Sequence, residues 1–303
     1  MSRLVHDLHF DPAYGMAVEV LPGIRRLTAA NPGPFTFHGT NTYLVGTQDL
    51  AVIDPGPDDE GHIAAILRAA GGARISTILV SHTHKDHSPA ARPLAHRTGA
   101  KIIGCRPHHS ARDLTLGEIN PLDASSDREF RADEELADGA ELDVSAGRFV
   151  AVATPGHTAN HLAFALPDEN VLFSADHVMA WSTSIVAPPD GSMQDYLDSL
   201  DVLLQRSEET YLPGHGAVLH SAHDYVAALK DHRLRREAAV LAVLGGAPLS
   251  VPQIVDAVYV GLEPSLKGAA ALSVLAQLER LIALGLVSPG HDGGLSDHYT
   301  RAG

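Results

Sequence analysis

The 303-residue sequence contains a single cysteine, and it has no long apolar run. Cys105 cannot form an intramolecular disulfide, and its place at the end of the apolar stretch 100–105 favours a buried, unreactive side chain. No apolar run approaches the roughly 20 residues of a membrane-spanning helix, and the first residues do not resemble a secretory signal. We therefore expect a soluble, cytoplasmic protein that has no membrane partner.

Positive charge is also scarce. The net charge is -15, from 22 Lys and Arg against 37 Asp and Glu, and residues 226–303 contribute none of this excess because their charges balance. An acidic main body repels polyanions at long range, which argues against nonspecific nucleic-acid binding but leaves a local basic patch open. A small-molecule substrate is the better expectation.

The order of apolar segments predicts an α/β protein with a small second domain. Strand-like segments separated by Gly and Pro alternate with helical patterns up to residue 214, and residues 106–135 lack any period, which predicts a surface loop or lid. From about Ala227 three helical segments and a Gly-rich hairpin follow in the order of a winged helix. We expect a main domain of residues 1–226 and a winged-helix-like domain of residues 227–303.

Histidine is unusually frequent, with 19 in the chain, and titratable side chains crowd the stretch "LVSHTHKDHSPA" directly after an apolar run. His82 and His84 lie two apart, so in extended chain they project to the same side, whereas Asp86 and His87 follow a turn and can face a second point. Three further segments, "TPGHT", "SAD" and "PGHG", each place a His or Asp directly after an apolar strand. The candidate metal ligands are His82, His84, Asp86, His87, His157, Asp176 and His215.

Five imidazoles and two carboxylates suit a pair of divalent ions. Zinc is the expected metal because His-rich sites favour it, and iron or manganese is not excluded by the ligand types.

These motifs resemble those of the metallo-β-lactamase superfamily, from "GTNTYLVG" at residues 39–46 to "PGHG" at residues 213–216. The resemblance implies a four-layer αβ/βα sandwich of two sheets flanked by helices. It also implies that His82, His84 and His157 hold one zinc, that Asp86, His87 and His215 hold the other, and that Asp176 bridges them. The tail and its "HRLRRE" segment resemble the branch with a C-terminal winged helix, which includes the animal β-lactamase-like protein 2 endoribonucleases and fungal thioesterase-like hydrolases.

Departures from other branches narrow the expected chemistry. Asp176 stands where many dizinc β-lactamases carry cysteine, so the resemblance does not imply β-lactamase activity. His84 stands where flavodiiron relatives carry glutamate, which favours hydrolysis over redox chemistry. The interval 177–214 is too short for the additional domain of the nucleases that carry a β-CASP insertion.

The expected function is a dinuclear zinc hydrolase in which a metal-bridging hydroxide attacks a small ester, thioester or lactone. Asp86 is expected both to ligate metal and to orient the hydroxide. The alternative is a single-strand endoribonuclease, with Arg233, Arg235 and Arg236 contacting phosphates.

DNA binding through the winged helix is a weaker alternative. The presumed recognition helix, residues 268–284, offers only Arg280 and Glu279 as charged side chains. We expect the tail to pack on the main domain or to form a homodimer.

Two histidines are candidates for the general acid that protonates the leaving group, His177 beside Asp176 and His161 four residues after His157. Anchoring a metal ligand through a ring N–H is the alternative role for either. If His177 is the acid, His177→Ala lowers kcat while the metal content, measured by elemental analysis, stays full. Unchanged turnover would remove His177 from the mechanism.

Overall fold

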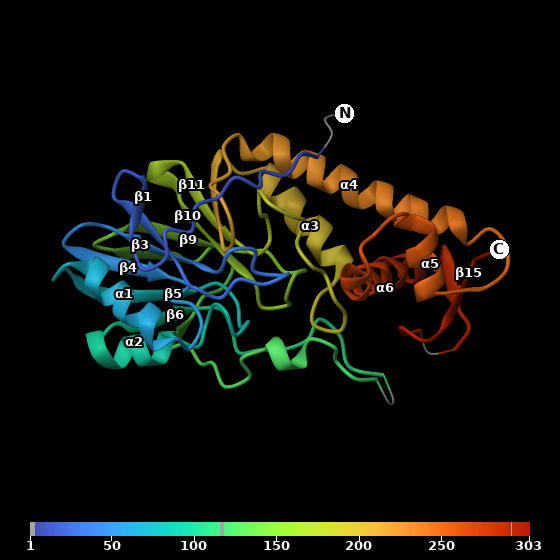
Figure 1. Ribbon diagram of the computed structural model, residues 1–303, viewed down its shortest axis with the longest axis horizontal. Helices are drawn as coiled ribbons and strands as arrows, with labels where there is room; N and C mark the ends of the chain where they lie inside the picture. Colours follow the sequence, from blue (N-terminus) through green and yellow to red (C-terminus); the bar gives the residue numbers. More distant parts are fainter. Residues whose placement is uncertain (1–3, 116–117, 292) are drawn as a thin grey trace.

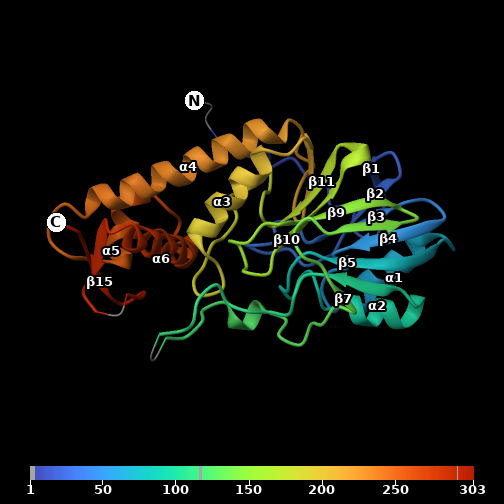
Figure 2. The ribbon, with the colours of Figure 1, turned by 180° about the vertical axis from the view of Figure 1, so that it is seen from behind.

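The computed structural model describes residues 4–115, 118–291 and 293–303. Its main domain is a sandwich of two β-sheets, with helices covering the outer face of each sheet (Figures 1 and 2). The predicted four-layer α/β fold is therefore confirmed. Within the described residues, no helix is both long enough and apolar enough to span a membrane.

The first sheet has seven strands in the order β1 to β7. Strands β1 to β4 are antiparallel neighbours, and β4 to β7 are parallel, with α1 and α2 as the crossover helices between β4, β5 and β6. The elements are β1 (Val18–Leu21), β2 (Ile24–Thr28), β3 (Asn41–Val45), β4 (Asp49–Ile53), α1 (Glu60–Ala70), β5 (Arg74–Val80), α2 (Ala91–Thr98), β6 (Lys101–Gly104) and β7 (Glu134–Glu135).

The second sheet has five strands in the order β12-β11-β10-β9-β8. Strands β8 to β11 form an antiparallel meander, and α3 returns the chain so that β12 lies parallel to β11. The elements are β8 (Glu141–Val144), β9 (Gly147–Ala153), β10 (Leu162–Leu166), β11 (Val171–Ala175), α3 (Met193–Leu204) and β12 (Thr210–Pro213). The short strands β1, β7 and β8 were not predicted, because each has at most four residues and none of their side chains is fully buried.

Local sequence explains where the crossover helices begin and end. Asp59 caps α1 by accepting hydrogen bonds from the backbone N–H groups of Gly61 and His62. Gly71 ends the helix at a φ of 61°, a left-handed conformation that glycine adopts without strain. Because both ends are fixed, β5 re-enters the sheet in register and delivers the histidine-rich loop to its carboxyl end.

The core lies mainly between the two sheets. Val52 of β4 and Ile78 of β5 pack in one cluster with Phe164 of β10 and Phe173 of β11, and all four side chains are almost fully buried. A second cluster joins the outer face of the five-stranded sheet to α3 and α4. Burial on both faces explains why these strands have near-continuous apolar sequences.

The predicted surface loop, of which residues 116 and 117 lie outside the described part, runs from β6 towards the C-terminal domain (Figure 1). Arg112 ties it to that domain through a 2.6 Å ion pair to Glu279 of the C-terminal domain, and a 2.7 Å ion pair to Glu118 holds the same side chain within the loop. The loop also closes on the histidine-rich segment, since the Lys85 N–H donates to the Ser125 carbonyl.

The C-terminal domain contains α5, α6 and a three-stranded sheet, and α4 connects it to the main domain (Figure 1). Its elements are α4 (Ala222–Val243), β13 (Leu249–Ser250), α5 (Val251–Val258), α6 (Lys267–Ala283), β14 (Val287–Pro289) and β15 (His298–Arg301). Helix α4 is continuous across the expected boundary between residues 226 and 227. Its Leu229 packs in the main-domain cluster, and its Val240 packs in the C-terminal cluster.

This division of α4 predicts how its substitutions act on stability. Leu229→Ala should lower the free energy of unfolding by about 2–5 kcal/mol, because it opens a cavity in the main-domain core. Leu234→Ala removes a side chain that is 38% exposed, and it should change the free energy of unfolding by less than about 0.5 kcal/mol. Denaturant unfolding measures both, and equal effects would contradict the packing described for α4.

Candidate metal centre

The seven predicted ligands meet at one end of the sandwich, and each follows a strand. His82, His84, Asp86 and His87 come after β5. His157 follows β9, Asp176 follows β11 and His215 follows β12. In the second sheet β9, β11 and β12 run in the same direction, and their carboxyl ends meet that of β5 at one edge of the sandwich, so residues more than 130 positions apart come into contact.

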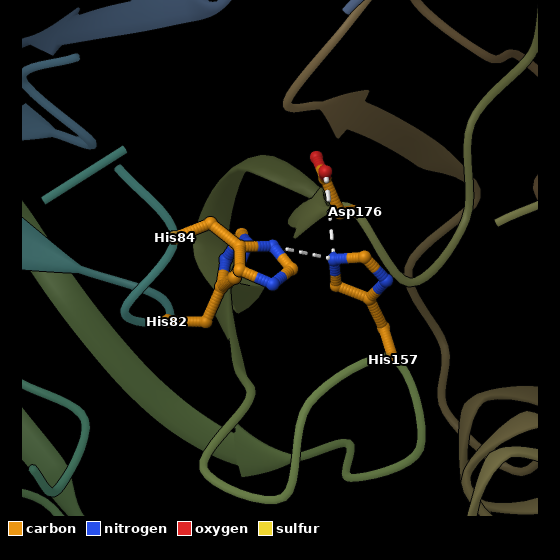
Figure 3. A group of neighbouring side chains, drawn as sticks. All are labelled: His82, His84, His157 and Asp176. Atoms are coloured by element: carbon orange, nitrogen blue, oxygen red, sulfur yellow. Dashed lines mark hydrogen bonds and ion pairs between the residues drawn. The ribbon is translucent and has the colours of Figure 1, made fainter. Parts of the chain in front are cut away.

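His82, His84, His157 and Asp176 form the first group (Figure 3). The Nδ1 atom of His84 lies 3.1 Å from Nε2 of His82 and 3.0 Å from Nε2 of His157. The carboxylate of Asp176 lies 3.7 Å from Nε2 of His157. Three ring nitrogens and one carboxylate thus face a common point.

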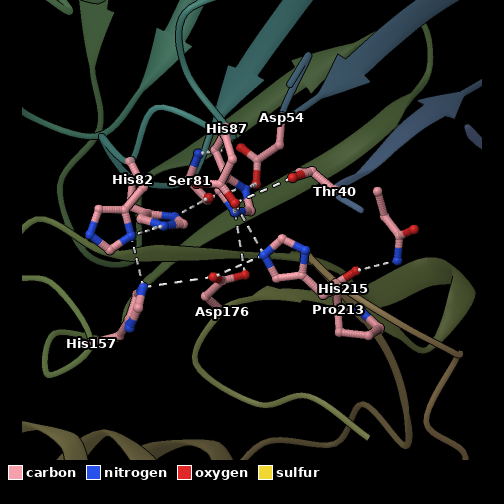
Figure 4. Close-up of polar contacts among 12 residues, drawn as sticks. Thr40, Asp54, Ser81, His82, His87, His157, Asp176, Pro213 and His215 are labelled. Carbon is pink, nitrogen blue, oxygen red and sulfur yellow. Dashed lines mark hydrogen bonds and ion pairs between the residues drawn. The ribbon is translucent and has the colours of Figure 1, made fainter. Parts of the chain in front are cut away.

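Asp86, His87 and His215 form the second group. Figure 4 shows His87 and His215 facing Asp176. Nε2 of His215 lies 3.3 Å from Asp86 and 3.2 Å from Asp176, and Nε2 of His87 lies 3.4 Å from each carboxylate. Asp176 therefore touches both groups, in the position expected of a bridging ligand.

These donor sets fit two divalent cations. Donor atoms at about 2.0–2.1 Å from one tetrahedral zinc ion lie roughly 3.4 Å apart, and the separations described above centre on this value. Nε2 of His87, Nε2 of His215 and Oδ1 of Asp176 are also buried without a hydrogen-bond partner among the described residues. Unpartnered buried donors and acceptors are costly, and a shared cation would satisfy all three at once.

The charge distribution supports the same assignment. Burial lowers the pKa of His84 to about 3, aided by the nearby His157, so this group presents neutral imidazoles, the form that binds metal. In the second group burial also opposes protonation of His215, but the Asp176 and Asp86 carboxylates raise its pKa to about 9. Two buried carboxylates thus draw positive charge into the site, which a metal ion would supply by displacing the proton.

Several residues that orient the ligands were not predicted. Asp54, at the end of β4, accepts from Nδ1 of His87 at 3.0 Å and from the Ser81 hydroxyl at 2.6 Å. Thr40 donates to Asp86 at 3.3 Å. Backbone carbonyls of Ile185 and Gly39 lie 2.7 Å and 3.1 Å from Nδ1 of His157 and of His215.

These partners fix which ring nitrogen faces the centre. Asp54, His82 and His87 also lie close enough to form a third group of three. The Asp54 oxygens are, however, already occupied by Ser81 and His87, so we assign Asp54 to orienting His87. An aspartate directly after the apolar strand in "AVIDPG" is the sequence signal that could have identified it.

The two candidate general acids lie behind the ligands. His177 is fully buried, its ring packs at a tilt against Tyr196 with the ring centres 4.4 Å apart, and it does not line the cavity over the metal groups. His161 is 1% exposed, and its Nδ1 contacts the Thr154 hydroxyl at 2.7 Å. The general-acid role of His177 stays a prediction, and this placement counts against it.

A cavity of about 340 Å³ lies directly over the metal groups. Asp86, His84, His157 and Asp176 form its floor, and apolar side chains form most of the wall. The wall includes Phe35, Leu122, Met179, Trp181 and Ile185, with Lys85 at the exposed side. The predicted lid contributes Leu122 and Ser125, so it does border the site.

Comparison with known families agrees with this architecture. The sequence profile of the metallo-β-lactamase superfamily matches residues 35–215, which include all seven predicted ligands. The chain belongs to this superfamily. The profile of the β-lactamase-associated winged helix domain matches residues 250–294, so the predicted winged helix is confirmed.

Relatives of this superfamily hydrolase align with most of its sequence. A "Beta-lactamase-like protein 2 homolog" of Caenorhabditis elegans is 28% identical and covers 88% of this chain and 87% of its own. An "Atrochrysone carboxyl ACP thioesterase" of Aspergillus chevalieri is 27% identical and covers 86% and 85%. The crystal structure of a β-lactamase domain protein from Burkholderia ambifaria is similar in fold, with a TM-score of 0.76, 22% identity and coverage of 96% and 95%.

Gly214 gives a sharp test of the centre, because no side chain fits there. A Cβ at this position would lie 2.3 Å from Oδ1 of Asp176 and 2.7 Å from Cε1 of His87. Gly214→Ala should therefore reduce bound metal well below that of the unmodified protein, measured by elemental analysis. Gly268→Ala, where nothing lies within 4 Å, is the control and should keep full metal content. Full metal content in a folded Gly214→Ala variant would contradict the ligand assignment.

Proposed function

We propose that this superfamily hydrolase cleaves thioesters of small acyl groups, with two divalent ions, zinc being the expected metal. The observation that carries the proposal is the position of the two ligand groups on the floor of a cavity with a mainly apolar wall. Metal ions in such a site activate water as a nucleophile and stabilise negative charge on a carbonyl oxygen. In thioester hydrolysis the water oxygen bonds to the carbonyl carbon, the C–S bond breaks, and the thiol leaves with a proton.

Asp86 is the side chain best placed to act on the attacking water. Its side chain is 24% exposed, against 7% for Asp176, so it alone of the two carboxylates offers substantial surface to the cavity. The Thr40 hydroxyl and the ring nitrogens of His87 and His215 contact its Oδ2 atom. Held in this way, the carboxylate can orient the water towards the acyl carbon and accept a proton from it.

The cavity wall favours an acyl group over a polar substrate. Phe35, Met179 and Trp181 border the same space as His84 and Asp86. The Trp181 ring is itself held by stacking on Phe37 at 4.8 Å, which gives the wall a fixed shape. A relative that is named as a thioesterase, similar over most of both chains, supports the thioester among the ester, thioester and lactone alternatives.

The arginines that suggested single-strand endoribonuclease activity give this alternative little support in the structure. Arg235 is exposed and pairs with Asp231, while Arg233 is 5% exposed at the domain junction. Arg233 and Arg236 line a cleft at the domain junction and Arg235 lies outside it, so the three arginines do not form one continuous surface for an RNA backbone.

The winged helix likewise offers little for DNA binding. Most of the larger side chains of α6 are buried, and Ala276 packs in the core cluster of the main domain. Arg280 pairs with Glu237 of α4 and donates to Gln194 at the start of α3. The helix that would read a groove is thus covered, in agreement with the expectation that the tail is a packing element.

The function is tested by a hydrolysis panel with the zinc-loaded protein. We expect turnover of acyl-CoA or S-acyl glutathione thioesters, with little cleavage of β-lactams or single-stranded RNA. Removing metal with a chelator should abolish turnover, and added zinc should restore it. Faster cleavage of RNA than of every thioester, or activity that survives complete metal removal, would overturn the proposal.

A further inference from the structure

A second cleft, of about 180 Å³, adjoins the metal-centre cavity. It lies between the main domain and the C-terminal domain, where α4, the end of α5 and the start of α6 face the segment 182–185. Pro34, Phe35, Ser182, Thr183 and Ile185 line both spaces, so only this rim separates them. A ligand long enough to cross the rim could occupy both.

The cleft is cationic in a strongly acidic protein. Arg233 and Arg236 line it together with His232, whose pKa burial and the neighbouring arginines lower to about 4 so that it is neutral, and none of the lining residues is acidic. Among the described residues, neither Arg233 nor Arg236 forms an ion pair, whereas the neighbouring Arg235 pairs with Asp231. Two guanidinium groups that remain protonated therefore share a cleft in which no carboxylate balances their charge.

Both arginines are held in place by uncharged contacts. Arg233 donates to the Ser184 carbonyl and lies 5.0 Å from the centre of the Tyr196 ring, and its Nε atom is buried without a partner. Arg236 stacks over Tyr259 at 4.5 Å and donates to the Val258 carbonyl at 3.1 Å. A buried, unbalanced cation is costly, and an anion in the cleft would offset that cost.

The segment 182–185 couples the cleft to the metal centre. On one side, the Ser184 hydroxyl donates to the Asp176 carbonyl, and the Ile185 carbonyl contacts Nδ1 of His157. On the other side, the Ser184 carbonyl accepts from Arg233. The same four residues thus support two metal ligands and one wall of the cationic cleft.

We propose that the cleft lined by Arg233 and Arg236 binds the phosphate of a phosphopantetheine arm, while the acyl end of the same thioester lies over the metal centre. This inference rests on the proposed thioesterase function and names its substrate class. Acyl groups carried on coenzyme A or on a carrier protein are joined through such an arm, with sulfur at one end and a phosphate ester at the other. One substrate then explains both the apolar cavity and the adjoining cleft.

Binding of two non-hydrolysable probes separates this proposal from the proposed activity. S-methyl-4′-phosphopantetheine and S-methylpantetheine differ only in the phosphate, and methylation removes the free thiol. Calorimetric titration of the zinc-loaded protein should show that the phosphorylated probe binds on the order of tenfold more tightly, or better. Equal affinity for the two probes would overturn the proposal, whether or not thioesters are hydrolysed.

Matched variants locate the phosphate contact. Arg236→Gln should remove the preference for the phosphorylated probe, and Arg236→Lys should retain part of it because the charge remains. Arg235→Gln, one residue away and outside the cleft, should leave the preference unchanged. An equal loss in Arg235→Gln would overturn the assignment.

A single-stranded RNA oligonucleotide provides the competing ligand. If it binds more tightly than the phosphorylated probe, and with the same dependence on Arg236, the carrier-arm assignment is wrong. If thioesters are not hydrolysed but the probe preference depends on Arg236, the phosphate site stands and the proposed thioesterase function fails.

Discussion

The need to balance two carboxylates in a nearly dry cavity floor governs the rest of the site. Asp86 and Asp176 face His215 at 3.3 Å and 3.2 Å, and together they raise the pKa of that histidine to about 9. Such a cluster is stable only with positive charge among the side chains. Divalent cations meet this need and use the neutral imidazoles of the first group as well. The binding of metal, the orientation of the ligands and the hydrolytic chemistry thus follow from one electrostatic constraint.

The fold meets this constraint through strand ends. Strands β5, β9, β11 and β12 deliver the ligands to one edge of the sandwich, and Asp54 at the end of β4 orients His87. The segment 182–185 then connects the centre to the domain junction, where α4 contributes Arg233 and Arg236. The C-terminal domain therefore supplies part of the wall of the cleft next to the metal cavity.

The sequence predicted the elements that have a strong local signal. Four ligands could be proposed from local sequence because each follows an apolar strand. His82 and His84 stand out by their spacing, and His157 and His215 by the glycine before each of them. Asp54 was missed because its contact with His87 links distant segments, and carbonyl partners such as Ile185 leave no side-chain signal. His177 was expected near the leaving group, but consecutive residues point in different directions, and the chain that aims Asp176 at the metal groups buries His177 behind them.

The start of the helical segment was placed at about Ala227 rather than at Ala222 for a related reason. Its buried side chains lie on one face, which packs on the main domain in the first half of the helix and on the C-terminal domain in the second half. That face includes Arg233, and the exposed side includes Leu234, so the apolar stripe is weak and a boundary drawn from pattern alone fell inside the helix. The central claim, that seven side chains hold two metal ions, is tested most directly by anomalous diffraction at the zinc edge from crystals grown with zinc. The account predicts two peaks, one beside His82, His84 and His157 and one beside Asp86, His87 and His215, with Asp176 between them. Absence of both peaks, or peaks only at other residues, would contradict it.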